Sequence, residues 1–183
     1  CPLGGSGEIG MNMNLFAYGK PGEHKWIMVD IGVTFADDTL PGIDLIYPDP
    51  GFIVDKKEDL LGIILTHAHE DHIGAIAHLW PQLKCKIFAT PFTAVLIKEK
   101  LKEKNIDATN YLKIVQLNGT VDLDPFKIEY ITLTHSILEP NGLRIETPAG
   151  VILHTGDWKI DPEPLIGEKI NSDRLKEIGK EGV

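Results

Sequence analysis

The sequence predicts a mixed α/β fold, and two patterns support this interpretation. Short apolar runs recur along most of the chain, separated by Gly, Pro and Asp, and each is too short for a helix of ordinary length. Amphipathic spacing typical of a helix is confined to a few segments. Strands therefore outnumber helices, and we expect helices that pack on a largely β core.

The expected strands occupy these short apolar runs, at residues 13–18, 26–31, 61–66, 86–89, 113–117, 127–133, 143–147 and 151–154. The expected helices cover residues 73–79, 92–104 and 174–178. In the second of these helices, Val95, Leu96 and Leu101 are predicted to face one way, with Lys and Glu on the other side. Residues 34–55 combine acidic residues and prolines with little periodicity, which predicts a loop with a functional role.

Composition limits the classes of function. A chain of 183 residues with 43% hydrophobic content can bury the core of one domain. The formal net charge of −9 argues against a broad basic surface for holding a polyanion. The two cysteines, Cys1 and Cys85, define no disulfide framework, so a reducing, cytoplasmic setting is favoured.

The sequence shows no sign of membrane insertion or export. It has no apolar run of membrane-spanning length, and its first residues lack the layout of a signal peptide. We therefore expect a soluble protein with no membrane partner. Because the chain opens without Met and closes directly after a helical pattern, we also expect that coding sequence is missing at both ends.

The chemistry is concentrated in the segment THAHEDH at residues 66–72, which directly follows the apolar run LLGIIL. This order places a ligand-rich loop at the exposed end of a buried strand, where α/β folds build sites. His67 and His69 are two residues apart, so in an extended segment both side chains point the same way and reach one metal. Asp71 and His72 lie at the turn into the next helix and are placed to face a second ion. Neutral imidazole and carboxylate suit zinc, or manganese where oxygen donors dominate.

Two later residues follow β patterns in the same way. His135 ends the run IEYITLTH and Asp157 ends VILHTGD. Taken singly, His135 is as often structural as functional, and Asp157 is more often an ordinary turn residue. The clustering of histidines at residues 67–72 makes a non-metal interpretation of that segment improbable. The remaining histidines, His24, His78 and His154, are predicted not to bind metal.

The glycine-rich segment GGSGEIG near the N-terminus has a superficial likeness to a nucleotide-binding loop. It lacks the terminal Lys-Ser or Lys-Thr of a phosphate-binding P-loop, and it precedes a strand pattern rather than a helix. We therefore interpret it as a tight turn near the site.

With these motifs in place, the chain resembles the metallo-β-lactamase superfamily, whose HxHxDH signature is matched by residues 67–72. Within that superfamily it is similar to the ribonuclease J family of the β-CASP group, through the segments PLGGSGEIGMNMN, LPGIDLIYPDP, ILTHAHEDHIGAI and LTHSILEPNGLRIETPAGVILHTGDWKIDP. The resemblance implies that residues 1–183 form the N-terminal half of an αββα sandwich. The β-CASP domain and the C-terminal completion of the metallo-β-lactamase domain would then be absent.

The resemblance also implies roles for the candidate residues. A first ion would be held by His67, His69 and His135, a second by Asp71 and His72, and Asp157 would bridge the two. The ions would be Zn²⁺, with Mn²⁺ or Mg²⁺ as alternatives, and a water between them would attack an RNA phosphodiester. Asp71, His72 and Asp157 are accordingly assigned to catalysis.

The resemblance further implies RNA processing and decay by 5′-to-3′ exonucleolytic cleavage, endonucleolytic cleavage or both. The expected partners are RNA, further copies of the protein in a dimer or tetramer, and an RNA-degrading complex. The missing parts supply another metal-binding His and the phosphate-gripping residues in that family. The second metal should therefore be weakly held here, and the isolated chain is expected to have little or no activity.

Two other classes of function remain open at this stage. The same centre on the same fold hydrolyses thioesters and β-lactams in other members, although β-lactam enzymes often carry Cys where Asp157 lies. A non-catalytic assembly module with a structural metal site is the second alternative, and an open coordination position would argue against it. An oxygen-reducing di-iron protein would carry Glu in place of His69.

Overall fold

The structure is a computed structural model that describes residues 1–183. Its first sheet has six strands in the order β1-β2-β3-β6-β7-β8. These strands are β1 (Pro2–Gly4), β2 (Met13–Tyr18), β3 (Lys25–Val29), β6 (Leu60–Ile64), β7 (Lys86–Ala89) and β8 (Leu112–Ile114). The β1, β2 and β3 pairings are antiparallel, and the pairings from β3 through β8 are parallel.

The second sheet is antiparallel, with four strands in the order β12-β11-β10-β9. Its strands are β9 (Thr120–Leu123), β10 (Phe126–Thr132), β11 (Asn141–Thr147) and β12 (Gly150–His154). A small separate sheet pairs β4 (Thr34–Phe35) with β5 (Leu45–Ile46). The helices are α1 (Gly51–Val54), the 3-10 turn η1 (Lys57–Asp59), α2 (Glu70–Ile73), α3 (Ile76–Leu83), α4 (Pro91–Glu103) and α5 (Ser172–Glu181).

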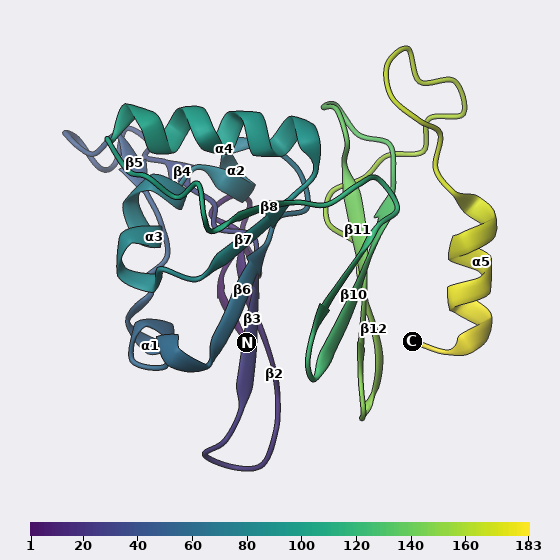
Figure 1. The fold of residues 1–183 in the computed structure, drawn as a ribbon. Helices are drawn as coiled ribbons and strands as arrows, with labels where there is room; N and C mark the ends of the chain where they lie inside the picture. The colour runs from purple at the N-terminus through teal and green to yellow at the C-terminus, as the bar shows by residue number, and fades with distance from the viewer.

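Apolar clusters between successive layers hold the molecule together. The largest cluster packs α3 and α4 on one face of the first sheet, and a second cluster joins the two sheets face to face. A third, small cluster places Ile178 of α5 against Ile131 and Leu133 on the outer face of the second sheet. Figure 1 shows this order of helices, sheet, sheet and helix. The expected mixed α/β sandwich of αββα type is therefore confirmed.

Helix α4 matches the expected helix closely, and Leu96 and Leu101 face the core as predicted, but Val95 does not. Pro91 occupies its first turn, where the missing N–H costs nothing. Ala94, Ile97 and Leu101 are buried at helical spacing, whereas Val95 is 54% exposed. The prediction for Val95 was wrong because the buried face of the helix is formed by residues three and four apart, Ala94, Ile97 and Leu101, and Val95 lies outside this series.

The helix expected at residues 73–79 begins earlier and is divided into α2 and α3. Gly74 lies at the division, where a Cβ would come 2.5 Å from both Val33 Cγ2 and Glu70 O. The chain therefore passes too close to its neighbours there for any side chain. Because α2 begins at Glu70, Asp71 and His72 both lie inside this short helix.

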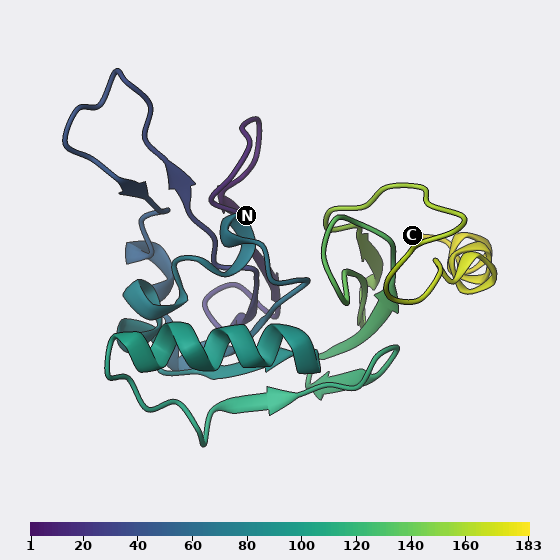
Figure 2. The same ribbon diagram turned by 90° about the horizontal axis from the view of Figure 1, so that it is seen from above.

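Residues 34–55 are mostly irregular, as expected, but they also contain β4, β5 and α1. Figure 2 shows the segment between β4 and β5 projecting from the rest of the molecule. Strands β1 and β9 were not predicted. No helix has both the length and the apolar character needed to cross a lipid bilayer.

Candidate metal centre

Three segments, each following a strand, carry the predicted site residues. The HAHEDH loop (residues 67–72) follows β6, the His135 loop (residues 133–140) follows β10, and the Asp157 turn (residues 155–158) follows β12. All six predicted ligands, His67, His69, Asp71, His72, His135 and Asp157, lie in these segments. One segment extends from the first sheet and two from the second, so the site lies where the sheets meet.

His67, His69 and His135 form the first group. One ring nitrogen from each lies within 4.8 Å of the other two. His67 Nε2 is 3.1 Å from His69 Nδ1, and the ring centroid of His135 is 5.3 Å from that of His67 and 4.9 Å from that of His69. Three imidazoles that converge in this way match the nitrogen ligands of a tetrahedral cation site.

The second group centres on His72. His67, His72 and Asp157 also offer ligand atoms within 4.8 Å of one another. His72 Nε2 lies 3.4 Å from Asp71 Oδ2 and 3.6 Å from Asp157 Oδ2. The same Asp157 oxygen is 3.8 Å from His135 Nε2, in the first group. The carboxylate of Asp157 therefore lies between the two groups.

Two histidines of the HAHEDH loop are buried while its acidic residues stay partly exposed, so the exposed position suggested by the sequence holds for only part of the loop. His67 is 0% exposed and His72 is 2% exposed. The His135 and Asp157 side chains, at 20% and 45%, form the accessible side of the site.

Asp30 is a site residue that the sequence analysis missed. His72 Nδ1 donates a hydrogen bond to Asp30 Oδ2 at 2.8 Å, and Asp30 Oδ1 accepts one from the backbone N–H of Thr66 at 2.8 Å. This bond turns His72 Nε2 toward Asp71 and Asp157, as carboxylate partners of ligating histidines usually do. The signal in the sequence was an acidic residue inside the apolar run WIMVDIG.

Asn12 is a second missed residue. Its Nδ2 donates to Asp71 O at 3.1 Å and lies 3.2 Å from His72 Nε2. A Cβ on Gly5, whose φ is +81°, would collide with the Asn12 side chain. The glycine-rich segment thus makes a close turn against a residue of the site, as expected.

Burial and neighbouring charge set opposite protonation preferences for two of the histidines. Burial, reinforced by the nearby His72, lowers the pKa of His67 to about 3, so its ring is neutral at physiological pH. Burial also opposes the charged form of His72, but the Asp30 and Asp71 carboxylates outweigh it and raise the pKa of His72 to about 10. A cation at His72 Nε2 must therefore displace a proton.

His24, His78 and His154 lie outside both groups of potential ligands. His24 packs near Trp26 and His78 stacks on Tyr47. His154 lies 6.0 Å from Phe16 in an edge-on arrangement. The prediction that none of them binds metal is consistent with these positions.

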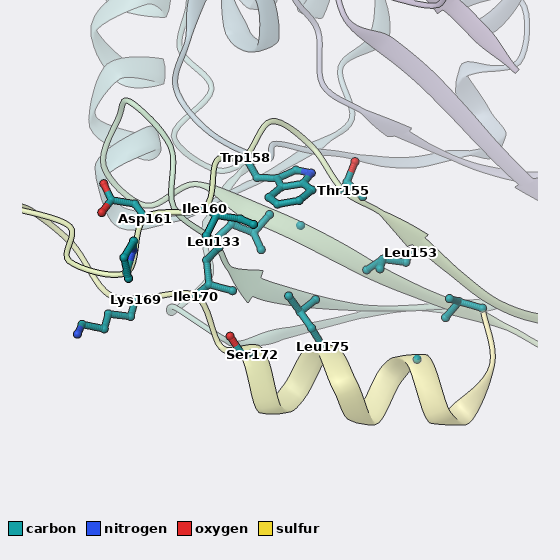
Figure 3. A pocket seen from close by; sticks show the side chains of 14 residues that line it. Leu133, Leu153, Thr155, Trp158, Ile160, Asp161, Lys169, Ile170, Ser172 and Leu175 are labelled. Atoms are coloured by element: carbon teal, nitrogen blue, oxygen red, sulfur yellow. The ribbon is translucent and has the colours of Figure 1, made fainter.

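A large cavity lies elsewhere in the molecule. It is a groove of about 650 Å³ between α5 and the outer face of the second sheet. Figure 3 shows Leu133, Trp158 and Leu175 gathered along it. Its walls are largely apolar, and none of the predicted metal ligands lines it. Trp158, which lines this groove, directly follows the candidate ligand Asp157 in the chain.

Comparison with known proteins places this geometry in a family. The family profile described as "Metallo-beta-lactamase superfamily" matches residues 13–173. The chain belongs to the metallo-β-lactamase superfamily. The match includes all three segments that carry the candidate ligands. The family resemblance noted in the sequence is therefore confirmed.

Curated relatives sharpen the resemblance. Ribonuclease J of Sinorhizobium meliloti is 46% identical over 182 residues, covering 100% of this chain and 32% of the relative. Ribonuclease J of Helicobacter pylori (strain ATCC 700392 / 26695) is 40% identical over 100% of this chain and 26% of its own length. Ribonuclease J 1 of Streptococcus pyogenes is 39% identical over 99% of this chain and 31% of its own length. The chain thus spans about a quarter to a third of the length of these relatives.

Solved structures agree on the fold. A variant of the metallo-β-lactamase from Cronobacter sakazakii aligns with a TM-score of 0.60 at 17% identity, covering 98% of this chain and 68% of the other. The metallo-β-lactamase fold protein YhfI from Bacillus subtilis aligns with a TM-score of 0.56 at 18% identity, covering 85% and 58%. At these identities the likeness concerns the fold alone.

Proposed function

We propose that this chain carries most of the metal centre of a metal-dependent ribonuclease that hydrolyses RNA phosphodiester bonds. The observation that carries the proposal is the position of Asp157, whose Oδ2 lies 3.6 Å from His72 Nε2 and 3.8 Å from His135 Nε2. A single carboxylate shared between two ligand groups is suited to hold two cations close together. The similarity of nearly every part of this chain to a segment of ribonuclease J proteins supports RNA as the substrate.

The donor set fits divalent cations. His67, His69 and His135 would hold the first ion, Asp71 and His72 the second, and Asp157 both. The nitrogen-rich first group favours Zn²⁺, and the carboxylates of the second also suit Mn²⁺ or Mg²⁺. When bound, two such ions supply a water of lowered pKa and positive charge opposite the phosphoryl oxygens.

The residues of the chain have distinct parts in this reaction. Asp30 holds His72 with its Nε2 toward the site, and Asn12 holds the backbone of Asp71 in place. The Asp71 carboxylate is partly exposed beside His72, where it can orient an attacking water and accept its proton. Substrate would approach from the accessible side formed by His135 and Asp157.

The net charge of −9 is unfavourable for binding a polyanion. Bound cations would neutralise the acidic centre locally. Further contacts to RNA are proposed to come from the rest of a longer protein, as are 5′-to-3′ exonuclease or endonuclease action and assembly into dimers, tetramers or an RNA-degrading complex. Both cysteines are unpaired, which fits the proposed cytoplasmic location.

The openness of the site favours catalysis over a purely structural role. A structural zinc site is usually closed by four protein ligands, whereas a catalytic one leaves a position free. Here Asp71 and Asp157 are 31% and 45% exposed beside the buried imidazoles. Solvent and substrate therefore have access to the cluster.

The test combines metal content with substrate choice. Metal stoichiometry and hydrolysis of a 5′-monophosphorylated RNA are measured on this chain and on a longer protein that contains it, with a thioester as the competing substrate. We expect two divalent ions and RNA cleavage in the longer protein, both lost in His67→Ala. His78→Ala is the matched control because His78 is exposed and lies outside both ligand groups. A longer protein that binds two ions, spares RNA and hydrolyses the thioester would overturn the proposal.

A further inference from the structure

The three ligand-bearing segments meet at one buried residue, Asn141, the first residue of β11. Its backbone N–H and its Nδ2 both donate to the carbonyl oxygen of Thr66, at 3.2 and 3.0 Å. Thr66 immediately precedes His67. The chain that leaves the His135 loop is therefore bonded directly to the backbone that enters the HAHEDH loop.

Asn141 also fixes the His135 loop internally. Its Nδ2 donates a second hydrogen bond, of 2.7 Å, to the carbonyl oxygen of Glu139. The Glu139 carboxylate accepts a hydrogen bond from the backbone N–H of Phe92 at 2.8 Å, in the first turn of α4. The loop that presents His135 is thus tied on one side to the HAHEDH loop and on the other to a helix packed on the first sheet.

The Asp157 turn rests on the same residue. Gly156 has a φ of +55°, and a Cβ there would come 2.8 Å from Asn141 O and 3.5 Å from Thr66 Cβ. The residue before Asp157 therefore passes directly against both Asn141 and Thr66.

Stability alone does not account for an asparagine here. Its Oδ1 is buried and has no hydrogen-bond partner, and neither does the Oγ1 of Thr132, its cross-strand neighbour. A buried acceptor without a partner costs free energy that an aliphatic side chain of similar size would avoid. The two donated bonds of Nδ2 are what an aliphatic residue cannot supply.

We propose that Asn141 is a positioning residue for the metal centre, fixing the separation between His135 and the His67–His69 pair and thereby the affinity for the first cation. The inference rests on the proposed function only in assigning a cation to these three imidazoles. Asn141 does not touch the ion or the substrate. It acts through Thr66 O and Glu139 O, which set the positions of the two loops that carry the ligands.

The test uses Asn141→Leu, which keeps the approximate volume and removes both side-chain donors. Thr132→Val is the matched control, because it removes the other unpartnered polar atom in the same cross-strand pair, an atom that makes no hydrogen bond to a ligand loop. Zn²⁺ affinity is measured by competition with a chelator, the Co²⁺ absorption spectrum reports ligand geometry, and thermal unfolding in EDTA reports the metal-free fold.

We expect Asn141→Leu to weaken binding of the first cation by about 10- to 100-fold, the range seen when outer partners of metal ligands are removed. Its Co²⁺ spectrum should change while the metal-free protein stays folded, and Thr132→Val should match the parent in both respects. Parental affinity and an unchanged spectrum in Asn141→Leu would overturn the proposal.

Two further outcomes also decide the question. If Asn141→Leu does not fold, Asn141→Ala and Asn141→Ser are measured in the same way. Failure of all three to fold would assign Asn141 a purely structural role and overturn the positioning role. A parent protein that binds no divalent ion would instead overturn the proposed metal centre itself, an outcome that the parent measurement alone identifies.

Discussion

The two sides of the candidate centre are built differently. On the first-sheet side, His67 and His72 are buried, and Asp30, Thr66 and Asn12 hold them in place. On the second-sheet side, His135 and Asp157 are partly exposed, and the only polar contacts of their side chains are with other candidate ligands. The difference indicates that the fold preforms one half of the site, whereas the other half depends on how two loops are anchored.

The largest effect is expected from the buried side, at His67. His67 would hold the first ion, and its ligand atom also lies within 4.8 Å of those of His72 and Asp157, so His67→Ala should reduce metal-dependent hydrolysis to background and lower the stoichiometry of both ions. Because the side chain is fully buried, some loss of stability should accompany this change. Elemental analysis and RNA cleavage measure the effect. Retention of both ions in His67→Ala would show that His67 is not a ligand.

On the accessible side, Asp157→Ala should weaken both ions while leaving the fold nearly intact, because the side chain is 45% exposed. Calorimetric titration with Zn²⁺ before and after the change gives the two affinities. Loss of one ion only would show that Asp157 serves one group and does not bridge them.

Asp30→Asn tests how far the buried side depends on its supporting carboxylate. Asparagine keeps the shape of the side chain but removes its negative charge, so the hydrogen bond from His72 Nδ1 becomes weaker. Affinity for the cation at His72 should therefore fall by about 10- to 100-fold. The first group should be less affected, since Asp30 makes no hydrogen bond to His69 or His135. An equal loss of affinity for both ions would mean that the first ligand group and the His72 group do not act independently.

The last effect concerns pH. In the metal-free protein the pKa of His72 is raised from 6.5 to about 10, so protonated His72 stabilises the fold fully below pH 6.5. That contribution is lost as the pH rises through 10. Urea unfolding in EDTA should therefore show decreasing stability across this interval, and Asp30→Asn should decrease less. A stability that rises over the same interval would contradict the assigned ion pair.

The sequence was sufficient for the residues whose chemistry is unusual in its local context. Three histidines and an aspartate within residues 67–72 predicted four side chains of the site, and the family resemblance added His135 and Asp157, which the structure brings to the same place. The mixed α/β class followed from strand-length apolar runs, and the αββα sandwich followed from the resemblance. The patterns in the chain itself are local, so they needed no knowledge of which segments meet.

Supporting residues were not predictable in the same way. Asp30, Asn12 and Asn141 matter because they contact Thr66, Asp71 or His72, which are distant in the chain. Only the tertiary arrangement creates those contacts. The incorrect orientation of Val95 has a related cause, because the position of the first sheet decided which stripe of α4 is covered.

The proposed first cation has ligands from both layers of the sandwich, since His67 and His69 follow β6 and His135 follows β10. An ion held there would act as a crosslink between two sheets that otherwise meet through apolar contacts and a few hydrogen bonds, such as those from Asn141 to Thr66 O and from Tyr130 to Phe88 O. Stripping the metal should therefore loosen the seam between the layers, and amide hydrogens of β10 and β11 should exchange faster. The supply of the proposed metal would then affect how long the folded protein survives, as well as its proposed hydrolysis.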